Sequence, residues 1–187
     1  MPDYLEAIEA LWVVWVLSWV AAAPFSAPTA KRSGLTFLPL GVIVVGMLLL
    51  QRMFPGFRDS ELWAPGEDAG WALFGVTVVG FLFAWWARLT LGRLWSGSIT
   101  LKTGHHIVDT GPYGIVRHPI YTGLLLSAFA SAAAFGRTTG FVIAAVLVVS
   151  FFIKASAEER FLSRELGAEA YAAYRARVPM LVPLGPK

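Results

Sequence analysis

Long runs of hydrophobic residues, separated by short polar segments, recur along the whole chain. A helix that crosses a hydrocarbon core of about 30 Å needs roughly 20 apolar residues, and five runs approach this length. They cover residues 5–23, 35–53, 69–87, 119–135 and 140–157. The pattern predicts an all-α integral membrane protein with about five transmembrane helices.

Two of these runs need a further argument. The first ends in alanines that could form a signal-peptide cleavage site, but it begins with Asp3, Glu6 and Glu9, whereas signal peptides begin with positive charge. We therefore expect a retained span. The last run has a short uncharged part, so it crosses the membrane only if the helix continues past Lys154 or if this side chain reaches the interface.

Composition narrows the class of protein. The 187 residues are 57% hydrophobic and 14% charged, with a mean hydropathy of +0.64, which leaves too few polar residues to cover a soluble domain. The absence of cysteine excludes a disulfide framework, a thiolate metal site and a cysteine nucleophile. The net charge of +3 comes without a basic run with interleaved aromatics, so nucleic acid is not an expected partner.

The distribution of charge predicts an orientation. If the spans alternate, twelve of the 15 lysines and arginines lie on one side of the membrane. Because positive loops face the cytoplasm, we expect an outside amino terminus and a cytoplasmic carboxyl terminus. We expect one membrane domain over residues 1–187, in which residues 1–87 form a scaffold and residues 88–187, with all three histidines, carry the function.

The densest polar stretch, HHIVDTGPYGIVRHPIYTG, covers residues 105–123. Glycines and a proline around Tyr113 predict a tight turn, and Pro119 suits the first turn of a helix. Arg117 and His118 then lie at the start of the fourth span, where free amides and the helix dipole would suit a carboxylate or phosphate. The alternative is that Arg117 reaches to lipid phosphates and His118 caps a carbonyl.

A second polar cluster ends the fifth span. Lys154 and Glu158 are four residues apart and share a helical face, whereas Glu159 points elsewhere. The pair is either an exposed ion pair or a functional group at the membrane boundary. The tail after it predicts an amphipathic helix on the cytoplasmic surface, in which Tyr171 and Tyr174 could be interface anchors.

Other side chains suggest helix contacts rather than chemistry. Small residues at Gly75 and Gly80 in the third span, and at Ser127, Ala128, Ser131 and Ala132 in the fourth, allow close helix approach. Trp12, Trp15 and Trp19 form a stripe on the first span, which we interpret as an interfacial belt. His105, His106, Asp109, His118 and Glu158 could supply metal ligands, but the spacing contains no HExxH pair, and we expect no metal.

Four motifs in order resemble the isoprenylcysteine carboxyl methyltransferase family, a group of membrane methyltransferases with phospholipid methyltransferases as wider relatives. They are a histidine-led segment at residues 105–108, GPYxxVRHPxYxG at residues 111–123, the Glu158–Glu159 pair after a helical hairpin, and GxxYxxYxxRVP at residues 167–179. The likeness covers about residues 91–179.

The resemblance implies that S-adenosylmethionine binds in a pocket covered by the cytoplasmic loop and the carboxyl-terminal helix, while a lipid-like or prenylated substrate enters between the helices. Glu158 would bind the ammonium group, and Lys154, where eukaryotic members have arginine, would face the substrate carboxylate; these two are the implied catalytic residues. Ser98 stands where the family has a glutamine. The implied cofactor-binding residues are His105, His106, Ile107, Val108, Tyr113, Arg117, His118, Pro119, Ile120, Tyr121, Glu158 and Glu159.

The expected reaction is methyl ester formation on an isoprenylcysteine-type carboxylate. A sulfonium methyl is electrophilic and a carboxylate is ionised near neutral pH, so the reaction needs neither a metal nor a strong base. A phospholipid amine would need a proton acceptor, which makes N-methylation the alternative. A sterol-reductase-like enzyme that uses NADPH and a non-catalytic membrane protein of the same fold remain further alternatives.

Overall fold

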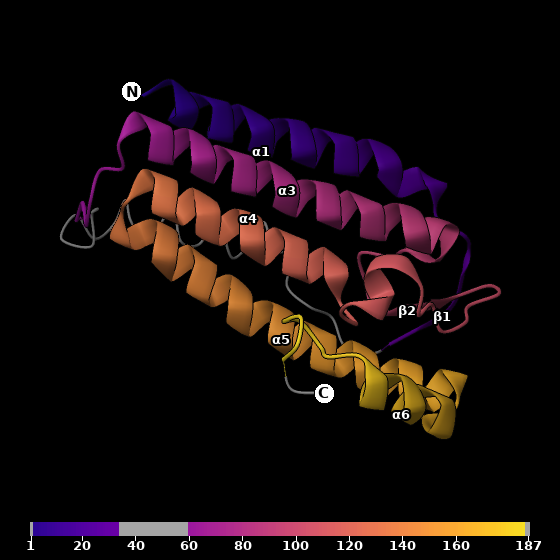
Figure 1. Cartoon of the computed structure of the whole chain (residues 1–187). Coiled ribbons are helices and arrows are strands. Elements are labelled where there is room, and N and C mark those ends of the chain that lie inside the picture. Colours follow the sequence, from indigo (N-terminus) through magenta and orange to yellow (C-terminus); the bar gives the residue numbers. More distant parts are fainter. Residues whose placement is uncertain (1, 34–59, 186–187) are drawn as a thin grey trace, which may run out of the picture.

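The computed structural model describes residues 2–33 and 60–185, and these residues are predominantly helical (Figure 1). Among the described residues, the long helices α1, α3, α4 and α5 lie side by side; α1 and α3 run in one direction, α4 runs back, and α5 runs in the direction of α1. A shorter helix, α6, packs beside the end of α5. The helices are α1 (Asp3–Ala22), α3 (Glu67–Leu91), α4 (Pro119–Phe135), α5 (Thr138–Leu166) and α6 (Ala168–Arg177).

Helices α3 and α4 are in the closest contact, because small residues face each other. A Cβ atom added at Gly80 would overlap Ser127 Oγ and lie 2.6 Å from the Gly123 carbonyl oxygen. Ser127 Oγ donates to the Thr77 carbonyl at 2.9 Å, which joins the two backbones. The predicted close approach is therefore confirmed at Gly80 and Ser127, whereas nothing lies within 4 Å of a Cβ added at Gly75.

Glycines with positive φ follow α4 and α5. Gly136 (φ 62°) ends α4 in the left-handed conformation, and Gly167 (φ 103°) separates α5 from α6. Helix α4 begins at Pro119, and a short 3₁₀ turn, η4 (Gly111–Gly114), precedes it; this is the turn expected around Tyr113.

A small sheet closes the end of the bundle at which α1 and α3 finish (Figure 1). Strand β1 (Thr29–Arg32) pairs antiparallel with β2 (Thr100–Lys102). Between α3 and β2 lies another 3₁₀ turn, η3 (Gly92–Leu94), and η1 (Ala23–Phe25) follows α1. The sheet ties the chain after α1 to the loop between α3 and α4, and the sequence pattern did not predict it.

The predicted spans at residues 5–23, 69–87, 119–135 and 140–157 are all helical, whereas the predicted span at residues 35–53 lies outside the described residues. In the described part of the chain three helical segments are long and apolar enough to cross a membrane, Asp3–Phe25, Glu67–Leu94 and Thr138–Leu166, and Pro119–Phe135 is a shorter apolar helix. The last span continues past Lys154 for three turns, as its crossing required. The count of five spans stays a prediction.

Candidate active site

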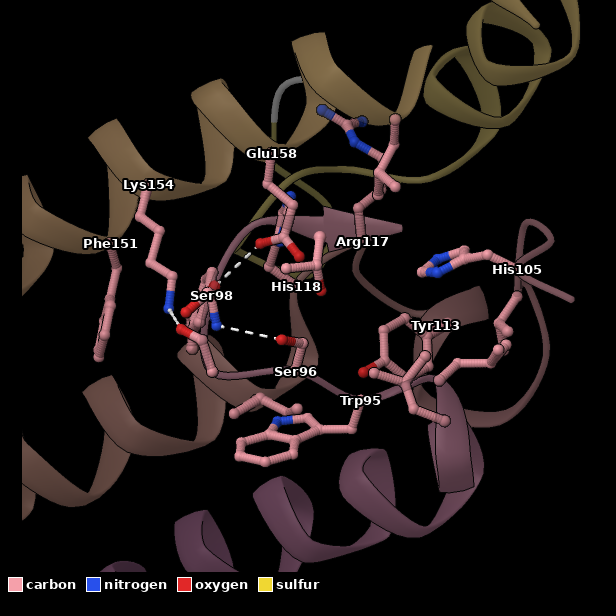
Figure 2. A pocket seen from close by; sticks show the side chains of 18 of the residues that line it. Trp95, Ser96, Ser98, His105, Tyr113, Arg117, His118, Phe151, Lys154 and Glu158 are labelled. Atoms are coloured by element: carbon pink, nitrogen blue, oxygen red, sulfur yellow. Dashed lines mark hydrogen bonds between the residues drawn. The ribbon is translucent and has the colours of Figure 1, made fainter. Parts of the chain in front are cut away.

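A cavity of about 540 Å³ lies at the end of the bundle closed by the small sheet, a volume typical of small-molecule sites. Figure 2 shows Lys154 and Glu158 reaching into it from α5, with Trp95 on the opposite wall. Its lining includes the following residues from the sequence-based prediction: His105, His106, Ile107, Val108, Tyr113, Arg117, His118, Ile120, Tyr121, Lys154 and Glu158.

Glu158 offers a half-buried carboxylate to the cavity. Tyr121 donates its hydroxyl to Glu158 Oε2 at 2.9 Å, and Glu158 Oε1 forms no hydrogen bond with any described residue. The Tyr121 ring is itself held between His118, at 5.4 Å, and Phe151, at 4.8 Å, in a nearly parallel stack. Glu158 is thus an oriented acceptor with one oxygen available to a cationic ligand.

Lys154 lies one helical turn before Glu158 and marks the boundary between polar and apolar parts of the cavity. Its Nζ donates to the Gly97 carbonyl at 2.9 Å and lies 5.4 Å from the centroid of the Tyr121 ring. Two of the three ammonium donors are left for a ligand, and the contacts hold the charge in a defined place.

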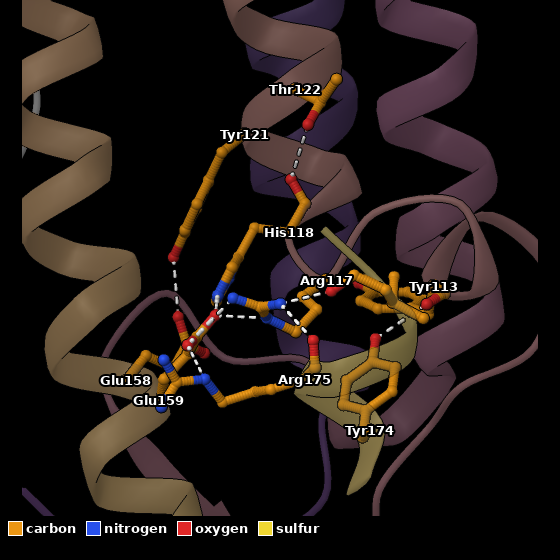
Figure 3. Close-up of polar contacts among 10 residues, drawn as sticks. Tyr113, Arg117, His118, Tyr121, Thr122, Glu158, Glu159, Tyr174 and Arg175 are labelled. Atoms are coloured by element: carbon orange, nitrogen blue, oxygen red, sulfur yellow. Dashed lines mark hydrogen bonds and ion pairs between the residues drawn. The ribbon is translucent and has the colours of Figure 1, made fainter. Parts of the chain in front are cut away.

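Glu159 turns away from the cavity and joins α5 to the start of α4 (Figure 3). Its carboxylate accepts from Arg117 Nε at 2.7 Å and from His118 Nε2 at 3.1 Å, and Arg175 Nε lies 3.3 Å from it. The Arg117 and Glu159 side chains are 2% and 4% exposed. Arg117 is therefore already paired, and it does not present a free guanidinium to a carboxylate or phosphate.

The segment after α6 crosses the start of α4 as a strap, which we define as residues 178–181. Its Pro179 and Met180 carbonyls accept the amides of Arg117 and His118 at 2.9 and 3.1 Å. Leu181 accepts the Thr122 hydroxyl at 2.6 Å. The bond to His118, the N-cap residue of α4, occupies one of the helix-start amides that the sequence suggested would be free for an anion.

The two tyrosines of α6 are buried rather than placed at a membrane interface. Tyr171 and Tyr174 are each 4% exposed, line the cavity and pack with Val178. Tyr174 donates its hydroxyl to the Tyr113 carbonyl at 2.8 Å (Figure 3). The interface-anchor interpretation of these residues is wrong, and α6 covers the cavity.

Tryptophans form the wall opposite α5. The Trp15 and Trp19 rings stack at 4.7 Å, and Trp95 meets Trp19 edge-on at 5.5 Å. The Arg88 guanidinium lies 4.1 Å from the Trp95 ring centroid and donates to the Ala22 carbonyl, which fixes Trp95 against the end of α1. Trp15 and Trp19 thus line the cavity, a role that the interfacial-belt interpretation missed.

Burial sets the protonation states on the loop side of the cavity. It lowers the pKa of His105; Glu158 opposes this shift, and the positive charges of His106 and Lys102 reinforce it. His105 Nδ1 accepts from the Lys102 amide at 3.3 Å, so a neutral ring carries its proton on Nε2. Burial also raises the pKa of Tyr113 well above its ordinary value, and the phenol stays neutral.

The structure brings together most, but not all, of the predicted site residues. Pro119 and Glu159 are the members of the implied cofactor set outside the lining, and both instead support the start of α4. Ser98 does line the cavity. No group of three or more acidic, histidine or cysteine side chains suited to a metal occurs among the described residues.

Comparison with known proteins identifies the family. A family model described as "Isoprenylcysteine carboxyl methyltransferase (ICMT) family" matches residues 72–164. Methanethiol S-methyltransferase 2 of Bradyrhizobium diazoefficiens is 30% identical to this chain over an alignment 195 residues long. The alignment covers 95% of this chain and 74% of that protein. The chain belongs to the isoprenylcysteine carboxyl methyltransferase family. It is therefore a member of a methyltransferase family, and the family implies a methyl donor.

Two further similarities support this assignment to the isoprenylcysteine carboxyl methyltransferase family. Protein-S-isoprenylcysteine O-methyltransferase B of Arabidopsis thaliana is 31% identical over 126 residues, which cover 64% of each chain. A solved structure of a eukaryotic intramembrane Ras methyltransferase, ICMT, matches 82% of this chain and 56% of its own, with a TM-score of 0.54 and 20% identity. The chain thus spans less than two thirds of these two proteins, and the structural likeness shows the fold alone.

Proposed function

We propose that this protein transfers a methyl group from S-adenosylmethionine to the carboxylate of an acceptor that carries an apolar group, at the cytoplasmic end of the helix bundle. One observation carries the proposal: Glu158 and Lys154 lie one turn apart on α5 and both line the same cavity. A carboxylate and an ammonium so placed suit a cationic methyl donor beside an anionic acceptor.

The residues present fit S-adenosylmethionine. Glu158 Oε1 can accept from its ammonium group, because Tyr121 occupies only the other oxygen. The neutral His105 offers Nε2–H to polar atoms, and Tyr113, Ile107 and Val108 provide surface for a planar base. When bound, S-adenosylmethionine supplies an electrophilic methyl group on a sulfonium centre.

Lys154 is suited to hold the acceptor. Its ammonium attracts a carboxylate, which is ionised near neutral pH, so the chain need not supply a strong base. The Gly97 carbonyl and the Tyr121 ring restrain the ammonium, which limits how closely it can neutralise the nucleophilic oxygen. Lysine lacks the bidentate fork of arginine, so it accepts anions of different shapes.

The remaining contribution of the protein to catalysis is to align the donor and the acceptor in a cavity from which water is excluded. Tyr171 and Tyr174 of helix α6 line the polar end of the cavity. Its apolar end is lined by Trp15, Trp19, Trp95 and Phe151. Removal of water strengthens the charge interactions of Glu158 and Lys154, and fixed positions for both ligands lower the entropic part of the barrier.

A small thiol is the second candidate acceptor, because the relative that covers 95% of this chain carries the name methanethiol S-methyltransferase. A small alkanethiol is mostly protonated near neutral pH, and it must lose its proton before attack because the thiolate is the nucleophile. Lys154 would favour the thiolate by its charge. Among the described cavity groups, Glu158 and the histidines His105, His106 and His118 are candidates to receive the proton.

The test is methyl transfer from labelled S-adenosylmethionine to purified protein with added acceptors. We expect a base-labile methyl ester from an apolar carboxylate, and loss of that product in Lys154→Met. A base-stable thioether as the main product would move the assignment to thiol methylation, and a stable lipid amine would move it to N-methylation. Absence of transfer by a folded protein that binds no donor would overturn the proposed function.

A further inference from the structure

The cavity has an apolar arm that points from Lys154 into the helix bundle. Helices α1, α4 and α5 each contribute side chains to it. On α4 and α5 these residues lie farther along the helix from the cavity end than His118, Lys154 and Glu158 do. The arm is the place for the apolar group of an acceptor whose anionic end meets Lys154. Its lining consists of Trp15, Trp19, Ile120, Tyr121, Leu124, Ser150, Phe151 and Ile153.

The depth of the arm follows from where the lining stops on each helix. On α5 the last described lining residue is Ser150, four residues from Lys154, which is about 6 Å at a rise of about 1.5 Å per residue. On α1 it is Trp15, four residues before Trp19 in the sequence, and on α4 it is Leu124, three residues after Tyr121. All three helices therefore limit the described arm to about one turn.

The next turn of each helix is closed core. Trp15 stacks on Phe81 at 5.2 Å, and Trp12 meets the same ring edge-on at 4.7 Å. Phe81, Ala128 and Leu147 are 4%, 8% and 7% exposed and belong to one packed cluster with Leu124 and Phe151. Trp12 also donates to Ser131 Oγ at 3.0 Å, which holds it against α4. The arm thus has a floor, and Trp15 is its largest side chain.

We propose that Trp15 is a specificity-determining residue, whose ring forms the floor of the acceptor arm and restricts the acceptor to a compact apolar group of about one helical turn in length. This inference rests on the proposed function. It separates short-chain acceptors from prenylated ones, because a farnesyl group is much longer than the arm and would have to leave it sideways between helices. Helix α1 lies outside the matched part of the family model, which begins at residue 72.

The test uses a series of acceptors that differ only in chain length. N-acetylcysteine S-substituted with methyl, butyl, prenyl, geranyl and farnesyl groups keeps the carboxylate constant, and the matching alkanethiols serve the thiol alternative. We expect kcat/KM for the short members to exceed that for the farnesyl member by at least about tenfold, a discrimination that a closed apolar pocket can supply.

Two variants change the depth of the arm in opposite directions. Trp15→Leu shortens the side chain and should shift the preference toward longer acceptors by about tenfold, whereas Ser150→Leu fills the arm and should reduce use of butyl more than use of methyl. Trp71→Ala is the matched control, because Trp71 is 41% exposed near the other end of the bundle, where its ring contacts Phe74. Binding of S-adenosylhomocysteine, measured for each variant, shows that the donor site has folded.

The outcomes separate the two proposals. If the protein binds the donor and methylates the farnesyl member as fast as the short members or faster, the proposed function stands and the inferred floor of the arm is contradicted. Short-chain preference that neither Trp15→Leu nor Ser150→Leu alters overturns the role of Trp15. Absence of donor binding and of transfer to every member overturns the proposed function, and the floor with it. Preference for short members that shifts in both variants, but not in Trp71→Ala, supports the inference.

Discussion

Glu158 and Glu159 are neighbours in the sequence, yet they face different surroundings. Glu158 lines the cavity, whereas Glu159 neutralises Arg117 and bonds His118 away from it. We expect Glu159→Gln to leave the buried Arg117 short of its counter-ion, at a cost of roughly 3–5 kcal/mol, and to lower the melting temperature in detergent. Glu158→Gln should melt close to wild type. Equal melting of both variants would contradict this division of roles.

The pKa of His105 gives a second expectation at the residue scale. Its pKa is lowered in the folded protein, so between that value and the ordinary value near 6.5 the unfolded chain binds more protons and stability rises with pH. The melting temperature of wild type should therefore fall more between pH 7.5 and pH 5.5, approximate bounds around that ordinary value, than that of His105→Asn. A larger fall in His105→Asn would show that the sign is wrong.

Sequence reasoning located residues that carry recognisable motifs and missed those that reach the cavity from elsewhere. Tyr121, Lys154 and Glu158 were accessible through the resemblance, and all three line the cavity. Trp15 was not, because its spacing on α1 is equally compatible with a lipid-facing stripe. A contact such as that between Trp12 and Ser131 joins residues 119 positions apart, and local periodicity contains no information about it.

The close packing of α3 against α4 yields an expectation at the element scale. Gly80→Ala would place a Cβ against Ser127 Oγ and the Gly123 carbonyl, so we expect the helices to separate and stability to fall by about 1–3 kcal/mol. Gly75→Ala is the matched control in the same helix, since nothing lies within 4 Å of its Cβ. Thermal unfolding in detergent compares the two. A greater loss in Gly75→Ala would contradict the packing assignment.

Helices were predictable and the sheet was not, for a physical reason. Long apolar runs determine membrane helices because the bilayer requires internally bonded backbone. Strand β2 has three residues, too few to show an alternating pattern, and it pairs with a strand about 70 residues earlier. Gly167 separates α5 from α6, and its φ of 103° favours glycine.

At the scale of the whole molecule, the positive charge at the cavity end predicts a cytoplasmic site. The chain contains no cysteine, so single cysteines can report the side on which each end lies. Ser60→Cys and Arg164→Cys place thiols at exposed positions at opposite ends of the bundle. We expect a membrane-impermeant maleimide to label Ser60→Cys in intact cells and Arg164→Cys only after permeabilisation. The reverse pattern would invert the orientation.

The fold as a whole was reachable from the sequence because hydropathy and the motif order point to the same architecture. The support of the start of α4 by the strap was not predictable in this way. The strap bonds Arg117 and His118 through its backbone carbonyls, which any residue type provides. Side-chain patterns therefore identify the residues that line the site better than they identify the backbone segments that support it.

The central claim is that the Glu158 face of the cavity binds the methyl donor. Calorimetric titration of the purified protein in detergent with S-adenosylhomocysteine tests it most directly, with Glu158→Gln and the exposed Glu169→Gln as a matched pair. We expect binding by wild type and Glu169→Gln, and affinity weaker by roughly tenfold to a hundredfold in Glu158→Gln, as for loss of a charged hydrogen bond. Wild-type affinity in Glu158→Gln, or no binding by a folded wild type, would contradict the account.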